Sequence, residues 1–420
     1  MRVKKLNLKP NPGRRLRVAR LTLACLFVYA TVFGNNALAE QAGSQRSWLD
    51  KLNISGSFDY ETYQYPTTDM FPGQVSQNHA LRLQFRQETD LGNRWRAGFK
   101  PFIRYDFNDQ GQNTLRLDEG WLEYAGENWD VRVGNQIFSW GQMESVSRID
   151  VLNPKDFRDD IVDSAKVGVP SVRLRWMFEN SDLSFYALPY YMPSKFPQRY
   201  NFYSISSGWP IDNADDTFEA QGAVRYFHAG DGYDFALSYT NLIEPTPIYQ
   251  FTRAGRVVAT PYRSQRFGIE ATKVLGSLLL KAEGFYRIPQ TDFLENIFLY
   301  TLGAEYTIPS IIGLSDLTLF AEYFGQIGSR GQVPFQALED SLFTGLRWTA
   351  NDQSRQQVEV GAVNNFNHVG TYLMRASYQR NLTDSLQLHI SYTDSFGFFA
   401  NPTIDEDRDG AFRVRLRYSF

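Results

Sequence analysis

The chain has 420 residues, carries 43 Lys and Arg against 46 Asp and Glu, and is rich in aromatic residues, with 32 Phe, 24 Tyr and 8 Trp. This mildly acidic balance argues against a nucleic-acid-binding protein, which neutralises phosphates with a surplus of Lys and Arg. The single cysteine, Cys25, falls in a leader segment, so we expect no disulfide and no cysteine metal site in the mature chain.

Residues 1–39 are predicted to be a cleaved secretory signal peptide. Residues 1–20 carry eight basic groups and no acid, residues 21–34 are largely apolar, and Ala37-Leu38-Ala39 forms an A-x-A cleavage site. The apolar run is shorter than the roughly 20 residues that a membrane-spanning helix needs. Cleavage after Ala39 would remove the eight basic groups, leaving 35 of the 43 against 46 acids, and residues 40–53 would form a short periplasmic segment.

From residue 54 onward the dominant pattern is an alternation of apolar and polar residues. In "NISGSFDYET" (53–62), Ile54, Phe58 and Tyr60 share one parity and polar residues occupy the other. The pattern recurs in "ALRLQFRQE" (80–88), "SVRLRWMF" (171–178), "DLTLFAEY" (316–323) and "LQLHISY" (386–392). Side chains alternate faces along a strand, so the pattern predicts a sheet with one apolar and one polar face.

Two architectures can accommodate a sheet with one apolar and one polar face. A soluble sandwich hides its apolar face between sheets, whereas a transmembrane barrel presents it to lipid and encloses polar groups. The polar face is crowded with Arg, Glu and Gln, which favours the barrel. Aromatic residues also gather near strand ends, as interfacial girdles require; they are Trp95, Tyr105, Trp121, Trp129, Trp176, Tyr306, Trp348 and Tyr418.

We therefore predict an all-β fold, a transmembrane antiparallel β-barrel of about 18 strands over residues 54–420. The predicted strands span 54–63, 79–89, 94–106, 114–125, 129–140, 171–178, 183–190, 218–228, 233–240, 265–273, 278–286, 297–308, 316–324, 341–349, 355–363, 370–380, 386–394 and 410–420. Short connections alternate with long ones, which is typical of outer-membrane barrels with short periplasmic turns and long extracellular loops. One register break, in "TLRLDEGWLEYAG" (113–126), predicts a bulge near Gly120 that turns Asp118, Glu119 and Glu123 inward.

The chain ends on the two-faced segment "GAFRVRLRYSF" (410–420), which is the predicted closing strand. A closed barrel leaves no backbone edge unpaired in hydrocarbon. The terminal Phe420 resembles the C-terminal aromatic signature of bacterial outer-membrane proteins. That resemblance implies recognition by the barrel assembly machinery and a setting among outer-membrane lipids and lipopolysaccharide.

A long connection follows the fifth predicted strand. Residues 141–170 are too many for a plain turn, and loops of this length are usually functional. General porins also fold the loop after their fifth strand into the lumen, an analogy of position. The motif Trp140-Gly141, then Asp150-x-x-Asn153-Pro154-x-Asp156, resembles an uncharacterised proteobacterial family of outer-membrane barrels, distantly similar to the eighteen-stranded alginate-export porins. The resemblance implies outer-membrane location and transport, without a substrate.

Physically, the motif suits a latch that folds the loop inward as a constriction. Gly141 permits a sharp departure from the wall, Asn153-Pro154 forces a turn, and the acidic loop would bind an arginine-lined wall through charge-assisted hydrogen bonds. An external loop that caps the rim is the alternative. The candidate pore-lining and constriction residues are Arg82, Arg86, Arg96, Lys100, Arg104, Arg132, Gln136, Trp140, Asp150, Asn153, Asp156, Arg158, Arg173, Arg175, Arg413, Arg415 and Arg417.

Enzymatic and metal signals are weak. His389-x-Ser391 has the spacing of an outer-membrane phospholipase pair, yet its parity points into the lumen, so we expect lumen lining and no enzyme. Asp405, Asp407 and Asp409 occupy the first, third and fifth positions of a calcium loop, but the twelfth is Leu416, which excludes an EF-hand. A loop Ca²⁺ site stays a candidate, and no other cofactor is expected.

The expected function is a porin-like outer-membrane channel for passive transport of small polar or anionic solutes. The basic arc formed by the first three strands and the closing strand favours anions, and later strands lean acidic. The alternative is a structural or adaptor barrel that works with a periplasmic lipoprotein or an exporter. Lateral delivery of hydrophobic molecules would require an apolar internal pocket and a gap in the wall.

Overall fold

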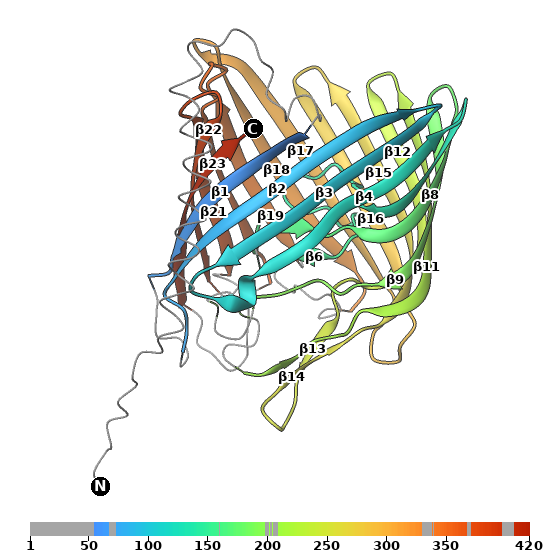
Figure 1. Ribbon diagram of the computed structural model, residues 1–420, viewed down its shortest axis with the longest axis horizontal. Coiled ribbons are helices and arrows are strands. Elements are labelled where there is room, and N and C mark those ends of the chain that lie inside the picture. The colour runs from blue at the N-terminus through green and yellow to red at the C-terminus, as the bar shows by residue number, and fades with distance from the viewer. Residues whose placement is uncertain are drawn as a thin grey trace. The chain divides into compact units, whose positions relative to one another are not determined.

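The computed structural model describes residues 54–66, 73–158, 160–197, 201, 204, 209–329, 338, 340–367, 371–396 and 407–420. Within them, eighteen strands form one antiparallel sheet that closes into a barrel (Figure 1). The strands are β1 (Ile54–Gln64), β2 (Gln77–Gly92), β3 (Trp95–Asp106), β4 (Thr114–Ala125), β5 (Trp129–Gln136), β8 (Val169–Met177), β9 (Ser181–Tyr191), β11 (Thr217–Gly230), β12 (Tyr233–Ile243), β15 (Arg263–Leu275), β16 (Leu278–Pro289), β17 (Ile297–Ile312), β18 (Ser315–Ile327), β19 (Ser341–Thr349), β20 (Gln357–Asn365), β21 (Tyr372–Asn381), β22 (Leu386–Phe396) and β23 (Asp407–Ser419). The predicted fold class is confirmed, and each of the eighteen predicted segments overlaps one strand.

The barrel closes where the first strand pairs with the last. Phe58 lies opposite Tyr418 and Tyr60 opposite Leu416 in the β1–β23 ladder. Beyond β23, the backbone N–H groups of Gly56 and Phe420 donate to each other's carbonyl oxygens at 2.9 and 3.1 Å. A Cβ on Gly56 would lie 2.8 Å from the Phe420 ring, so glycine lets the terminal aromatic pack across the seam.

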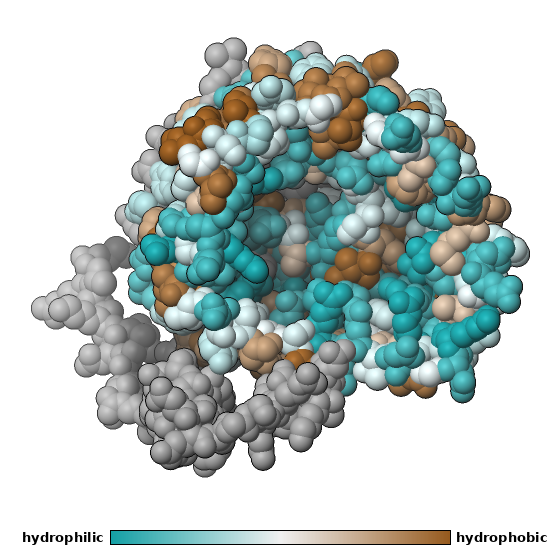
Figure 2. Space-filling model, turned by 90° about the horizontal axis from the view of Figure 1, so that it is seen from above, coloured by the Kyte–Doolittle hydropathy of each residue, from teal (hydrophilic) through white to brown (hydrophobic). Residues whose placement is uncertain are grey.

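The two faces of the sheet differ as the alternation predicts. Large apolar side chains project outward and are highly exposed, among them Leu115 at 81% and Ile312 at 75%. Charged side chains of the other parity are buried inside, with Glu61 at 0% and Arg413 at 2% exposure. Figure 2 shows a hollow whose walls are mostly hydrophilic. In a soluble sandwich the apolar side chains would be buried and the charged side chains would be exposed. No helix in the described part of the chain is long and apolar enough to cross a membrane.

Short turns gather at one end of the barrel and long connections at the other. The turns between β2 and β3, β11 and β12, and β15 and β16 leave only two residues between strands. The long connections carry the remaining elements, which are η1 (Gln110–Gln112), β6 (Lys155–Asp156), β7 (Ala165–Lys166), β10 (Ile211–Asp212), β13 (Ile248–Phe251) and β14 (Val257–Thr260). The β13–β14 hairpin extends beyond the rim at the long-loop end (Figure 1).

The predicted bulge occurs in β4. The β3–β4 register pairs Lys100 with Glu119 and Pro101 with Leu117, so Asp118 is the extra residue. Asp118 and Glu123 are both buried at 3% or less. The bulge also corrects one aromatic assignment: Trp121 does not lie in an outer girdle, because it faces the lumen with the Arg132 guanidinium 3.8 Å from its ring.

Candidate functional site

The connection between β5 and β8, residues 137–168, folds into the barrel, and an apolar cluster anchors its two ends. Trp140 and Ile149 are buried against lumen-facing side chains of β9, β11 and β12. The full cluster is Phe138, Trp140, Ile149, Leu152, Val169, Tyr186, Leu188, Ala223 and Leu242. Trp140 is therefore buried between its own loop and the barrel wall, which agrees with an anchoring role and places its side chain away from the open lumen.

Asn153 joins the two legs of this connection. Its side-chain oxygen accepts from the Phe138 N–H at 2.7 Å, and its amide donates to the carbonyls of Gln136 and Val167 at 2.9 and 2.8 Å. These bonds replace ladder bonds just past Gln136, and β5 ends there instead of at the predicted residue 140. The side chain of Gln136 donates to the Ser171 carbonyl at 3.1 Å, which ties β5 to β8. Asn153 and Gln136 thus support the loop.

The first half of the loop donates hydrogen bonds to three carboxylates of the barrel wall. Gly141, at φ +80°, donates its N–H to Glu270 of β15 at 2.8 Å. Glu283 of β16 accepts from the Arg148 N–H at 2.5 Å and from the Ser147 hydroxyl at 3.0 Å. A carboxylate has only acceptor oxygens, so it suits a loop that presents several backbone donors.

The third carboxylate, Glu322 of β18, binds the tip of the loop. It accepts from the N–H groups of Glu144 and Ser145 at 2.6 and 3.1 Å, and from the Ser145 hydroxyl. Glu144 itself pairs with Arg347 of β19, which also binds Glu359 of β20 at 2.9 Å. The first half of the loop is therefore fixed to a wall that extends from β15 to β19.

The second half of the loop binds arginines of β21, β23 and β4, so here the loop supplies the carboxylates and the wall supplies the donors. Asp156 accepts from Arg116 of β4 at 3.1 Å, and Asp160 pairs with Arg375 of β21 at 3.2 Å and Arg413 of β23 at 2.7 Å. Burial acts to raise the pKa of Asp160, but the two guanidinium groups, together with backbone N–H donors of Val162 and Asp163, outweigh it and lower the pKa below its ordinary value. Since β15 and β23 lie eight strands apart around a ring of eighteen, the loop spans the lumen.

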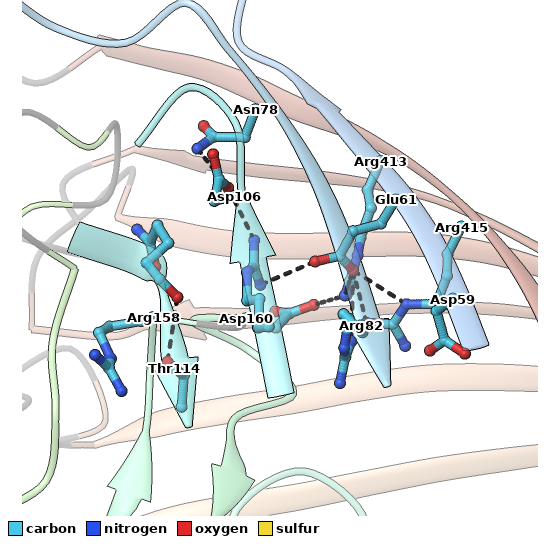
Figure 3. A network of polar contacts seen from close by, with 12 residues as sticks. Asp59, Glu61, Asn78, Arg82, Asp106, Thr114, Arg158, Asp160, Arg413 and Arg415 are labelled. Carbon is cyan, nitrogen blue, oxygen red and sulfur yellow. Dashed lines mark hydrogen bonds and ion pairs between the residues drawn. The ribbon is translucent and has the colours of Figure 1, made fainter. Parts of the chain in front are cut away.

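Glu61 is the centre of the basic wall. Four arginines from three strands bind this fully buried carboxylate: Arg82 at 3.4 Å, Arg104 at 2.9 Å, Arg413 at 2.6 Å and Arg415 at 3.2 Å. Figure 3 shows the group converging on Glu61, with Asp160 reaching it through Arg413. Arg375 and Asp106 extend this network, and the Arg417–Asp59 pair lies beside it in the β1–β23 ladder, so the group holds six arginines and four carboxylates. We call it the seam network, because it straddles β1 and β23.

A second arginine cluster lies on β3, β5 and β8. Glu123, 1% exposed, pairs with Arg96, with Arg132 at 2.5 Å and with Arg173 at 3.2 Å. Asp130 binds Arg173 at 2.6 Å and Arg175 at 2.5 Å. Four arginines here share two carboxylates, so this cluster also keeps a positive surplus.

The other predicted site residues lie as follows. Arg86 is exposed and pairs with Glu88 at 2.6 Å, and Lys100 lies 3.9 Å from Glu119. Asp150 pairs with Lys166 within the loop, and Arg158 binds Asp156 at 2.8 Å. The calcium candidate falls outside what the structure describes: Asp405 is not described, and neither are the side chains of Asp407 and Asp409. That site stays a prediction.

Sequence reasoning did not select Glu61, Glu270, Glu283 or Glu322 as site residues. Parity placed them on the inner face, among other inward acids. Their importance comes from long-range pairing: Glu322 contacts residues about 180 positions away, and Glu61 meets Arg413 across the seam. A single sequence carries no local signal for contacts of this kind.

Comparison with known proteins shows the fold. No family model matches the sequence, and no curated protein matches it. Among solved structures, outer-membrane porins of Pseudomonas aeruginosa are similar. OccK3 (OpdO) has a TM-score of 0.51 at 10% identity, over 89% of this chain and 97% of that one. OpdK, solved with vanillate, has a TM-score of 0.51 at 9% identity, over 87% and 98%. Identities this low show a shared barrel fold.

Proposed function

We propose that the protein is a porin-like channel of a bacterial outer membrane, through which small polar solutes diffuse passively. The observation that carries the proposal is the loop that crosses a polar lumen and is fixed at both walls. A loop held in this way would narrow the passage through a water-filled barrel. No separate plug domain is needed for this. In this arrangement the lumen-facing arginines of the candidate set would line the remaining passage, and Gln136, Trp140 and Asn153 would hold the loop in place.

The charges around the loop support selectivity for anionic solutes. The seam network and the second cluster together hold ten arginines and six carboxylates. The opposite wall leans acidic, with Glu270, Glu283, Glu322 and Glu359 facing the lumen. Unlike charges on facing walls produce a transverse field in a confined, low-dielectric space, and such a field orients dipolar and charged solutes.

Within this proposal, residues 1–39 direct export and Phe420 serves barrel assembly. The protein acts without catalysis, and its partners are lipid, lipopolysaccharide and a small solute. The adaptor alternative has no specific contact in its favour among the described residues. Lateral delivery is also disfavoured, because the buried inner surface is rich in ion pairs.

Conductance in planar bilayers tests the function directly. Purified full-length protein should give steady ohmic steps, and a salt gradient should produce a reversal potential of anion-selective sign. A barrel that inserts, as shown by heat-modifiable migration on gels, yet passes no current would contradict the channel and support the adaptor.

A further inference from the structure

A cavity of about 180 Å³ lies between the inward loop and the long-loop ends of β12, β15 and β16. Its floor is formed by Phe285 and Arg287 of β16, and its roof by the loop residues Arg148, Val151 and Lys155. Residues of the long connections also border the cavity, among them Pro245, Thr246 and Leu338.

Cations outnumber acids in the lining. The cavity is bordered by four cationic side chains and two carboxylates; these are Arg148, Lys155, Arg266, Arg287, Asp150 and Glu244. Both carboxylates are engaged. Asp150 pairs with Lys166. Glu244 accepts two hydrogen bonds from the Arg266 guanidinium, and the one from Nε measures 2.8 Å.

Lys155 is the cation with the least compensation. Its backbone N–H donates to the Ser194 hydroxyl at 3.0 Å, but its half-buried ammonium forms no ion pair with any carboxylate that the structure describes. Burial lowers the pKa of Lys155 and the nearby Lys166 lowers it further, and the charges of Asp150 and Asp163 offset this only in part. An anion bound beside it would favour its charged form.

Apart from the polar residues Asn153, Ser194 and Thr246, the rest of the lining is apolar or aromatic. Phe285 lies under the Arg266 guanidinium at 4.2 Å, and the Tyr262 hydroxyl accepts from Arg287 at 3.1 Å. Val151, Pro245 and Leu299 complete the surface. A pocket with an apolar body and a few convergent polar groups is the usual form of a small-molecule site.

We propose that this cavity binds a small monocarboxylate with a compact ring, its carboxylate beside Lys155 and its ring against Phe285 and Tyr262. The volume supports one ring, because a cavity of about 150 Å³ accommodates benzene. The inference rests on the proposed function, since the cavity would be a binding station on the transport path.

Benzoate binding to the detergent-solubilised full-length protein, measured by titration calorimetry, tests the site independently of transport. Benzoate should bind, neutral benzamide should bind about ten-fold more weakly, and the larger 2-naphthoate should not bind. Lys155→Gln should weaken benzoate about ten-fold, which is the size of one charge-assisted hydrogen bond, and leave benzamide unchanged. Lys155→Arg should retain benzoate binding.

Two further variants separate the cavity from general effects of charge and folding. Thr246→Trp, at the cavity border, should abolish binding by filling the space without changing charge. Arg256→Gln removes a cation from the exposed Arg256–Asp212 pair at the same end of the barrel, and it should bind benzoate like the wild type. Heat-modifiable migration identifies the folded variants.

The outcomes distinguish the two proposals. Equal affinities of folded Lys155→Gln and wild type, or equal affinities for benzoate and benzamide, would overturn the site even if the channel conducts. Specific benzoate binding by a barrel that passes no current would leave the site standing and remove the proposed function.

Discussion

Arg413 on the last strand lies 2.6 Å from Glu61 on the first, and both side chains are buried at 2% exposure or less. The same guanidinium reaches Asp160 of the loop at 2.7 Å. One side chain therefore links barrel closure to loop position. Arg413→Gln should destabilise the barrel by about 3–5 kcal/mol, because it leaves Glu61 and Asp160 with fewer counter-charges in a buried site.

Urea unfolding in lipid vesicles, followed by tryptophan fluorescence, measures that loss. Arg86→Gln is the matched control, since Arg86 is exposed and pairs with the exposed Glu88. It should change stability by less than about 1 kcal/mol. Similar losses in both variants would show that the seam network adds no more stability than a surface pair.

Neutralising Arg413, Arg415 and Arg417 together should shift ion selectivity toward cations. All three side chains face the lumen and lie in the seam network, so their removal reverses its positive surplus. The reversal potential in a salt gradient reports the shift. An unchanged reversal potential in the folded triple variant would show that the seam network is not the origin of the ion selectivity.

The fold could be predicted from sequence because alternation is a local signal. Period-two parity fixes which side chains face lipid, and the turns between strands carry glycine and polar residues. Parity also located the β4 bulge, since Leu117 and Leu122 both project outward although they differ in parity. The sequence could not fix where β5 ends, because its end is set by Asn153, seventeen residues later.

The site was predictable only in part, for the same reason. Arginines such as Arg413 were assigned to the lumen by parity, but their partners depend on which strands meet across the ring. The acidic loop was expected to bind arginines, and Asp156 and Asp160 do so. The first half of the loop donates backbone N–H groups to Glu270, Glu283 and Glu322. Backbone donors do not depend on the type of side chain, so the pattern of charged residues could not predict these contacts.

Glu322→Gln should loosen the loop tip while leaving the barrel folded. The substitution replaces one acceptor oxygen with an amide donor, which would face the N–H of Glu144 or Ser145. Single-channel recordings should show added current noise and brief changes in conductance level. Glu305→Gln is the control, since Glu305 pairs with Lys281 in the wall. Equal noise in the two variants would argue against the tether.

The ion pairs of Asp160 with Arg375 and Arg413 should keep their contribution to stability in mild acid. The pKa of Asp160 is lowered in the folded protein, so its contribution to stability is fully present above the ordinary value of 3.8 and is lost as the pH falls through the lower folded value. The difference in unfolding free energy between wild type and Asp160→Asn should therefore be constant from pH 7 down to about pH 5 and shrink only at lower pH. Urea titrations of both proteins at each pH measure this difference. A difference that already disappears between pH 7 and pH 5 would mean that Arg375 and Arg413 do not hold Asp160 in its charged form.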